Sequence, residues 1–318
     1  MIEARYEERA KVIGHLRGSD KSVSSKYHYD ERGSQLFEEI AELEEYYLTR
    51  TERTMLEDLM PTLVSEFRPA TLVELGAGSA EKSRIILSAM IATRGHAVFV
   101  PIDVSGDFLQ GTAEALRGEY DSLEVHPLVA DILESFALDP ALPGPRWVAL
   151  LGSTLGNFDT PHALELLMHV TAVMSHDDRF LLGVDLAAGS GKSAERIEAA
   201  YNDARGITAQ FSLNLLSVLN DSFGSDFDLD GFRHRSEYNE ELSRIETSLV
   251  SRRAQTVCFP DEEPIVIAQG EAIRSEISCK YDRPTVERLF SGAGLEVDRW
   301  MTDPDELYAL VLGRLSDS

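Results

Sequence analysis

The chain has 318 residues, enough for one large domain or two moderate ones with a sizeable buried core. Hydrophobic residues make up 43% and charged residues 27%, which is ordinary globular usage and excludes disordered and fibrous proteins. The 55 acidic residues exceed the 30 Lys and Arg and give a formal charge of −25, so the chain repels polyanions. Since the densest basic run is only Arg252-Arg253, we expect no nucleic-acid partner and no membrane partner.

Cysteine usage and the N-terminal sequence bear on compartment and metal content. Cys258 and Cys279 lack CxxC spacing, which excludes a disulfide scaffold and a cysteine-based zinc site. Residues 226–237 have the carboxylate spacing of a calcium loop, but Arg233 takes a position that is normally apolar, so we expect no metal. The charged N-terminus lacks the apolar segment of a signal peptide, and no stretch approaches the ~20 apolar residues of a membrane helix. We expect a cytoplasmic protein and a monomer.

The first part of the chain predicts helices. Leu36, Ile40, Leu43 and Tyr47 recur at helical spacing. A second helix is predicted over 52–67, with Pro61 inside it expected to kink or split it.

From residue 70 the sequence pattern changes to short apolar runs that alternate with helical patterns. The predicted strands are 70–75, 97–103, 123–130, 147–151 and 180–184, and the helices between them include 81–90, 108–116 and 162–174. Continuous apolar runs that alternate with helices are typical of a parallel sheet covered on both faces.

After Asp185 this pattern breaks and later returns. Helices are predicted at 193–204 and 207–219, antiparallel strands at 243–249, 255–259, 265–268 and 272–278, then a helix at 284–290 and strands at 295–300 and 308–312. We therefore predict an α/β protein with a doubly wound, mainly parallel core over 53–187 and 277–318. A second α+β domain over 1–52 and 188–276 interrupts it.

The strongest local signal is the glycine turn Glu74-Leu75-Gly76-Ala77-Gly78, which follows the first predicted strand. Glycines there let the backbone approach a ligand closely, at the edge where open α/β sheets bind cofactors. A dinucleotide fingerprint needs a third glycine, but that position is Glu81, a carboxylate where a diphosphate would sit. This disfavours a nicotinamide oxidoreductase.

Acidic residues at the ends of the next two strands suit a nucleoside without phosphates. Asp103 ends the second strand, where a carboxylate accepts from the two hydroxyls of a ribose. Asp131 ends the third and can accept from an adenine amino group while Ile132 packs on the ring. An adenosyl group with an amino-acid tail is S-adenosylmethionine, which these residues predict as the cofactor. A strand-turn-helix with no ligand is the alternative.

Five motifs in unbroken order resemble the L-histidine Nα-methyltransferase family of ergothioneine biosynthesis. They are EYYLTR at 45–50, ELGAGSAEKS at 74–83, DVS at 103–105, LGSTLGNF at 151–158 and SEISCK at 275–280. The resemblance runs from about residue 21 to the C-terminus, and several motifs in one order are far more specific than a lone glycine turn.

This resemblance implies a class I S-adenosylmethionine-dependent methyltransferase core of Rossmann-like fold with a separate substrate-binding domain. The implied activity is transfer of three methyl groups to the α-amino group of L-histidine, which gives hercynine. The residues implied at the methyl donor are Gly76, Lys82, Asp103, Asp131, Ile132 and Gly152. Those implied at the amino acid are Tyr46, Asn157, Tyr201, Glu276 and Ser278, with Asn157 and Tyr29 as catalytic residues.

The residue types at the implied amino-acid site fit this chemistry. Tyr46 and Tyr201 can donate to a carboxylate without adding charge, and the amide of Asn157 can both donate and accept. Glu276 and Ser278, two apart on a strand, face the same side and match the two nitrogens of an imidazole. Taken singly, each also fits an ordinary role, as a half-buried helix, turn or strand residue.

One position departs from the family. Thr247 stands where the members that we would compare carry Met. If this residue lines the substrate pocket, the smaller polar side chain changes the pocket's shape. An N-methyltransferase of the same fold that acts on another amino acid, such as a tryptophan derivative, therefore remains an alternative. A sensor that binds S-adenosylmethionine or an amino acid without turnover is a more remote one.

Overall fold

A computed structural model describes residues 2–189 and 191–317; residues 1, 190 and 318, which the predicted domain ranges include, lie outside the described residues. The chain contacts divide it into two compact units. Unit 1 is Met1–Tyr47 with Ala188–Cys279, and unit 2 is Leu48–Ala187 with Lys280–Ser318. The sequence predicts these three crossings after residues 52, 187 and 276.

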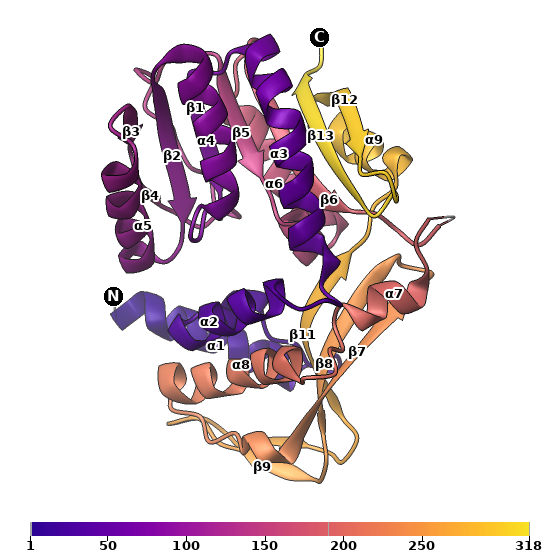
Figure 1. Cartoon of the computed structure of the whole chain (residues 1–318). Coiled ribbons are helices and arrows are strands. Elements are labelled where there is room, and N and C mark those ends of the chain that lie inside the picture. The colour runs from indigo at the N-terminus through magenta and orange to yellow at the C-terminus, as the bar shows by residue number, and fades with distance from the viewer. Residues whose placement is uncertain (1, 190, 318) are drawn as a thin grey trace. The chain divides into compact units, whose positions relative to one another are not determined.

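Unit 2 contains an eight-stranded, mainly parallel sheet, which confirms the predicted fold class (Figure 1). Its strand order is β12-β13-β6-β5-β1-β2-β3, with β4 paired to β2. The strands are β1 Thr71–Leu75, β2 Ala97–Asp103, β3 Leu123–Val125, β4 Leu128–Val129, β5 Arg146–Leu150, β6 Arg179–Asp185, β12 Leu295–Thr302 and β13 Tyr308–Leu315. Strand β13 runs antiparallel to both β6 and β12. The strand order reverses beside β1, between β2 and β5, which is where such sheets bind ligands.

The apolar runs become buried strands because helices cover the sheet. All five residues of β1 are buried, and Trp147 on β5 is completely so. The helices of this unit are α3 Tyr47–Phe67, α4 Glu81–Arg94, α5 Gly106–Glu119, α6 Thr160–Val173 and α9 Arg283–Gly292. A short 3-10 helix follows β5 at Thr154–Asn157.

Two local predictions in unit 2 differ from the structure at least in part. Of the predicted kink or split at Pro61, the split is wrong: α3 is one helix, because buried Leu56, Met60 and Val64 keep it packed on both sides of the proline. The run predicted at 123–130 is two short strands, since Pro127 between them has no N–H for the ladder.

Unit 1 has a three-stranded antiparallel sheet in the order β11-β8-β7 and a separate β9-β10 hairpin. Its strands are β7 Phe232–Asn239, β8 Arg244–Ser251, β9 Gln255–Val257, β10 Ile265–Ile267 and β11 Ala272–Cys279. Its helices are α1 Ile2–Arg17, α2 Glu31–Ala41, α7 Ala194–Ala199 and α8 Ile207–Phe223, with 3-10 turns at Ser25–His28 and Leu229–Gly231. Helix α8 packs on β7 and β8.

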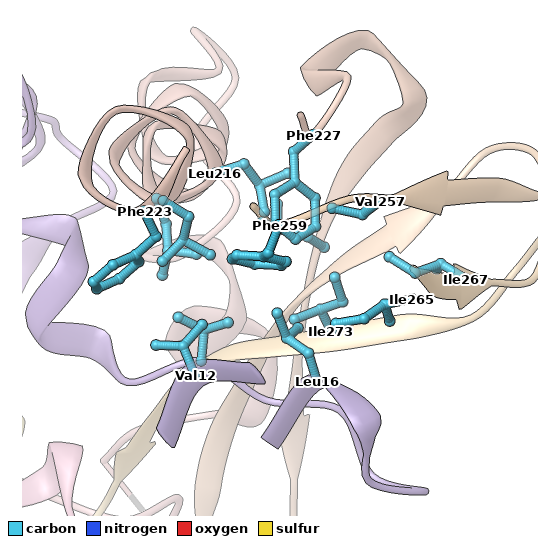
Figure 2. Packing of buried hydrophobic residues seen from close by; sticks show 14 of the residues in the cluster. Val12, Leu16, Leu216, Phe223, Phe227, Val257, Phe259, Ile265, Ile267 and Ile273 are labelled. Atoms are coloured by element: carbon cyan, nitrogen blue, oxygen red, sulfur yellow. The ribbon is translucent and has the colours of Figure 1, made fainter. Parts of the chain in front are cut away.

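A buried apolar cluster holds unit 1 together. Figure 2 shows Val12 and Leu16 of α1 facing Leu216 and Phe223 of α8, with Ile273 of β11 beside them. The hairpin residues Val257, Phe259, Ile265 and Ile267 and the loop residue Phe227 complete it. Elements far apart in sequence therefore share one core.

Strand β7 and the end of α7 depart from the sequence prediction. Strand β7 was not predicted, because only one face of the strand is buried and its sequence therefore contains the polar run from Arg233 to Arg235. Helix α7 ends at Ala199 rather than near 204, since Asp203 instead accepts hydrogen bonds from the first amides of α8.

Among the described residues, no helix is both long and apolar enough to cross a membrane.

Candidate active site

The glycine turn after β1 leaves its backbone open. Gly76 and Gly78 have φ of +70° and +50°, a region that favours glycine. Over residues 2–189 and 191–317, a Cβ at either position would meet no atom within 4 Å other than its chain neighbours, so the space beside the backbone is open there. A ligand can therefore approach this backbone directly.

Asp103 at the end of β2 is tied to the glycine turn. Its Oδ2 accepts from the amide of Gly78 at 3.1 Å, and its Oδ1 accepts from the amide of Ser105 at 3.0 Å. The side chain is half-buried, and each oxygen, besides the hydrogen bond that it accepts, has a further lone pair with which it can accept. This geometry suits ribose hydroxyls.

Asp131 and Ile132 lie close to the same edge. They follow β4, whose Val129 pairs with Asp103, and both are half-buried. Asp131 accepts from the amide of Leu133 at 3.0 Å. The structure thus brings three of the predicted donor residues to neighbouring strand ends.

Apolar side chains that the sequence analysis missed lie at this edge as well. Val104, Phe108 and Val129 are large hydrophobic residues with exposed side chains. Each is within five positions of Asp103 or Asp131. Nearness in sequence to a strand-ending acid was the signal that could have found them, and exposed apolar surface there suits a planar ring.

Lys82 and Gly152 meet at a buried glutamate that the sequence analysis also missed. The Lys82 ammonium donates to Oε2 of Glu52 at 2.5 Å, and the Gly152 amide lies 2.9 Å from both carboxylate oxygens. Glu52 is completely buried and also accepts from the hydroxyl of Tyr308 at 2.8 Å. The sequence contained a signal that Glu52 is buried. Glu52 lies four residues from both Leu48 and Leu56, which places it on the apolar stripe of α3.

Glu74, next to the glycine turn, is a second buried carboxyl in unit 2. Burial raises its pKa from 4.5 to about 7, against the opposing effects of Ser83 and Lys82. The Ser83 hydroxyl donates to it. Unlike the half-buried Asp103, this carboxyl sits within the core.

In unit 1 the predicted tyrosines and serine come together. The hydroxyls of Tyr201 and Ser278 are 2.8 Å apart, and both residues are buried. The Tyr46 ring packs edge-on against Tyr201, with ring centroids 6.1 Å apart. Aromatic contacts continue through Phe37 to Tyr29, whose own side chain is exposed.

Thr247 and Glu276 are cross-strand neighbours in unit 1. They pair directly between β8 and β11, so their side chains share one face. A bulge at Ser275 precedes Glu276 and shifts the alternation of β11 by one residue. As a result Glu276 and Ser278 join Ile273 on the face where Thr247 is buried.

His28, which is buried, and His234, which is half-buried, make hydrogen bonds around these residues. His234 Nε2 donates to the carbonyl of Tyr201 at 2.9 Å, which leaves Nδ1 to accept from Ser212 at 3.0 Å. The His28 ring nitrogens lie 3.3 Å from the carbonyls of Phe211 and Ser275. Burial lowers the pKa of both histidines, that of His28 to about 4, so both are neutral at pH 7.

Asn157 belongs to the other unit. It ends the 3-10 helix after β5 and is half-buried, whereas the other predicted amino-acid-binding residues lie in unit 1. The predicted site residues are therefore grouped in two sets, one in each unit.

The calcium-like loop has its carboxylates engaged by protein groups. Asp226 accepts from the amide of Cys258 at 2.6 Å, and Asp228 pairs with Arg253. Over residues 2–189 and 191–317 no group of three or more His, Cys, Asp or Glu is arranged to hold a metal ion.

Comparison with known proteins identifies the family. The family model described as histidine-specific methyltransferase, SAM-dependent, matches residues 8–315. A histidine N-alpha-methyltransferase of Mycolicibacterium smegmatis is 37% identical over 306 residues, which cover 96% of this chain and 94% of that protein. Ergothioneine biosynthesis protein 1 of Neurospora crassa is 33% identical over 307 residues, covering 91% of this chain and 33% of that protein.

A solved structure shares the fold. The mitomycin 7-O-methyltransferase MmcR matches 98% of this chain and 67% of its own, with a TM-score of 0.53 at 14% identity. That likeness concerns the fold alone, whereas the sequence matches extend over nearly the whole chain. The chain therefore belongs to the family of histidine-specific, S-adenosylmethionine-dependent methyltransferases.

Proposed function

We propose that this protein transfers methyl groups from S-adenosylmethionine to the α-amino group of L-histidine. The observation that carries the proposal is that Glu276 and Ser278 lie together on one face of β11, where the hydroxyl of Ser278 is hydrogen-bonded to that of Tyr201. A carboxylate and a hydroxyl two residues apart can pair with both nitrogens of an imidazole. Family membership over residues 8–315 supports the same reaction.

The donor set of unit 2 fits S-adenosylmethionine. The open backbone at Gly76 and Gly78 admits a close ligand, and the carboxylates of Asp103 and Asp131 suit a ribose and an adenine amino group. When bound, the sulfonium supplies an activated methyl group for in-line displacement. The protein's contribution is then mainly alignment, which is worth roughly 7–11 kcal/mol in well-oriented reactions.

Unit 1 acts in this proposal as the substrate-binding domain. Tyr46 and Tyr201 are the residues proposed to donate to the histidine carboxylate, and Asn157 is the residue proposed to orient the amino group. The hydroxyl groups of the tyrosines and the amide of Asn157 add no charge, so they tolerate the cationic methylated product. The tyrosine rings can also attract that cation through cation–π interaction. The attacking amine must be neutral, and Tyr29, with its exposed side chain, is the residue proposed to assist there.

We further propose three successive transfers, which yield Nα,Nα,Nα-trimethylhistidine (hercynine) for ergothioneine biosynthesis. The name of the Neurospora crassa relative supports this pathway. Each transfer after the first requires the methylated amine to turn in place while its carboxylate stays bound. We also propose that the protein works as a cytoplasmic monomer, which light scattering of the purified chain and cell fractionation test.

The decisive experiment supplies methyl-deuterated S-adenosylmethionine with L-histidine or another amino acid and follows the products by mass spectrometry. We expect histidine to gain one, two and finally three labelled methyl groups. Methylation of another amino acid with none on histidine would refute the substrate. Accumulation of a mono- or dimethyl product would refute only the threefold transfer.

A matched pair of variants tests the amino-acid site. Glu276→Gln removes the charge proposed to face the imidazole, so the KM for histidine should rise at least about tenfold. The KM for S-adenosylmethionine should stay within about twofold. Glu237→Gln on β7, whose carboxylate is 66% exposed, is the control and should change neither constant. An equal rise of both constants in Glu276→Gln would contradict a role in substrate binding.

Thr247 supports one second candidate. It is buried opposite Glu276, with its hydroxyl 2.9 Å from that of Ser236, so it bounds the same face. A side chain smaller than methionine leaves more room there, and a tryptophan derivative is the larger substrate that would use it. Competition between histidine and such a derivative in one reaction decides between the two.

A further inference from the structure

Glu52 makes an unusual set of contacts for a helix residue. Its carboxylate accepts from Lys82 on α4, from the Gly152 amide after β5 and from Tyr308 on β13, all within unit 2. The side chain has no exposed surface. An ionised carboxylate in a core is costly, and apolar residues of equal volume often stabilise a fold as well. A role beyond stability would account for its presence.

The sheet is shaped to admit this carboxylate. Gly183 on β6 faces it, and a Cβ at that position would lie 2.1 Å from Oε1 of Glu52 and 2.7 Å from the Tyr308 hydroxyl. The closest of these atoms belong to a side chain held by hydrogen bonds, so they cannot move away freely. Only glycine leaves room for the carboxylate between β6 and α3.

Lys82 and Gly152 are the half-buried members of this cluster, whereas Glu52 and Tyr308 are completely buried. The Lys82 side chain is 22% exposed, and its Nζ would lie 2.9 Å from a Cβ on Gly152, so it rests against that glycine. Gly152 follows β5, and Lys82 begins the helix after β1. The ammonium therefore lies at the carboxyl ends of two neighbouring strands, where the strand order reverses.

The surrounding charges make the position of this cation critical. Burial raises the pKa of Glu74; among the nearby charges, the ammonium of Lys82 lowers it and the carboxylates of Glu52 and Asp103 raise it. An anionic group that enters here meets repulsion unless Lys82 is held close to it. A lysine side chain has four rotatable bonds, so a fixed buried partner reduces the entropy lost when it binds an anion.

We propose that Glu52 is a positioning residue for the methyl donor. Glu52 holds the Lys82 ammonium against Gly152, and the ammonium there binds the carboxylate at the methionine end of the donor. This inference rests on the proposed function. Glu52 itself does not touch the ligand, because it is buried and both of its oxygens accept from protein donors. It acts through Lys82.

Two ligands separate this role from a general structural one. S-adenosylhomocysteine carries the amino-acid tail, and 5′-methylthioadenosine lacks it but keeps the adenosine. Calorimetry on Glu52→Gln should show S-adenosylhomocysteine weakened at least about tenfold. Binding of 5′-methylthioadenosine should stay within about twofold of wild type. Equal weakening of both ligands, or of neither, would overturn the inference.

Tyr308→Phe is the matched control, since it removes one donor to Glu52 but leaves the charge beside Lys82. It should keep the affinity for S-adenosylhomocysteine within about threefold, and a loss as large as that of Glu52→Gln would overturn the inference. Lys82→Met should show the same tail-selective loss as Glu52→Gln. The double variant should be no weaker than Lys82→Met, whereas additive losses would show that Glu52 acts by another route.

Circular dichroism verifies that each variant folds. If Glu52→Gln does not, Glu52→Asp takes its place, because it keeps the charge but withdraws it from Lys82 by one methylene. It too must weaken S-adenosylhomocysteine selectively, and a proportional loss of both ligands overturns the inference. Wild-type protein that binds neither ligand would refute the donor site itself. Tight wild-type binding that Glu52→Gln leaves unchanged would refute the role of Glu52 alone.

Discussion

Glu74→Gln is expected to stabilise unit 2, and increasingly so as the pH rises. In the folded chain burial raises the pKa of Glu74 from 4.5 to about 7. The folded state therefore favours the neutral carboxyl, while the unfolded chain ionises it at ordinary pH. The stability associated with this group is complete below pH 4.5 and is lost as the pH rises through 7. Glutamine stays neutral throughout and keeps an oxygen to accept from Ser83.

The size of the effect follows from the change in pKa. Raising a carboxyl from 4.5 to about 7 corresponds to about 3 kcal/mol of lost stability well above pH 7. Between pH 5.5 and pH 8 the folded protein passes from the largely neutral to the largely ionised carboxyl. Over that interval the stability of Glu74→Gln relative to wild type should grow by about 2 kcal/mol.

Urea unfolding followed by tryptophan fluorescence measures this difference. Trp147 on β5 and Trp300 on β12 are the two tryptophans of the chain, and both lie in unit 2. Wild type, Glu74→Gln and Glu57→Gln, which alters an exposed glutamate on α3, are compared at pH 5.5 and pH 8. A stability difference for Glu74→Gln that does not change with pH would refute the reasoning. If the stability of the Glu57→Gln control relative to wild type grew by the same amount, the effect would be due to the change in net charge.

Three other predictions test the geometry of unit 2. Gly183→Ala should cost about 1–3 kcal/mol in urea unfolding, because its methyl group overlaps the Glu52 carboxylate; unchanged stability would contradict this. Lys280→Met should cost about 3–5 kcal/mol, since it leaves Asp185 buried without the ammonium now 2.8 Å away. Adding Asp185→Asn should recover part of that loss, and additive costs would contradict the pairing. Asp103→Asn should weaken S-adenosylhomocysteine at least about tenfold by calorimetry, and binding within twofold would exclude a ribose contact.

The class of the fold, and the half of the site that depends on local order, can be predicted from the amino-acid sequence. Apolar runs alternating with helices indicate a covered parallel sheet, because burial on both faces shows in each strand's own composition. The glycine turn and Asp103 are readable because they directly follow strands. In a parallel sheet such positions gather at one edge, whichever strands are neighbours.

Which distant residues meet depends on how the segments pack together. Glu52 contacts residues 30, 100 and 256 positions away in sequence, and no local pattern encodes such separations. Likewise, i and i+2 spacing puts Glu276 and Ser278 on one face, but the bulge at Ser275 selects which face. A bulge follows from how β11 pairs with β8. Periodicity describes one segment at a time, whereas register and buried polar contacts arise from packing between segments.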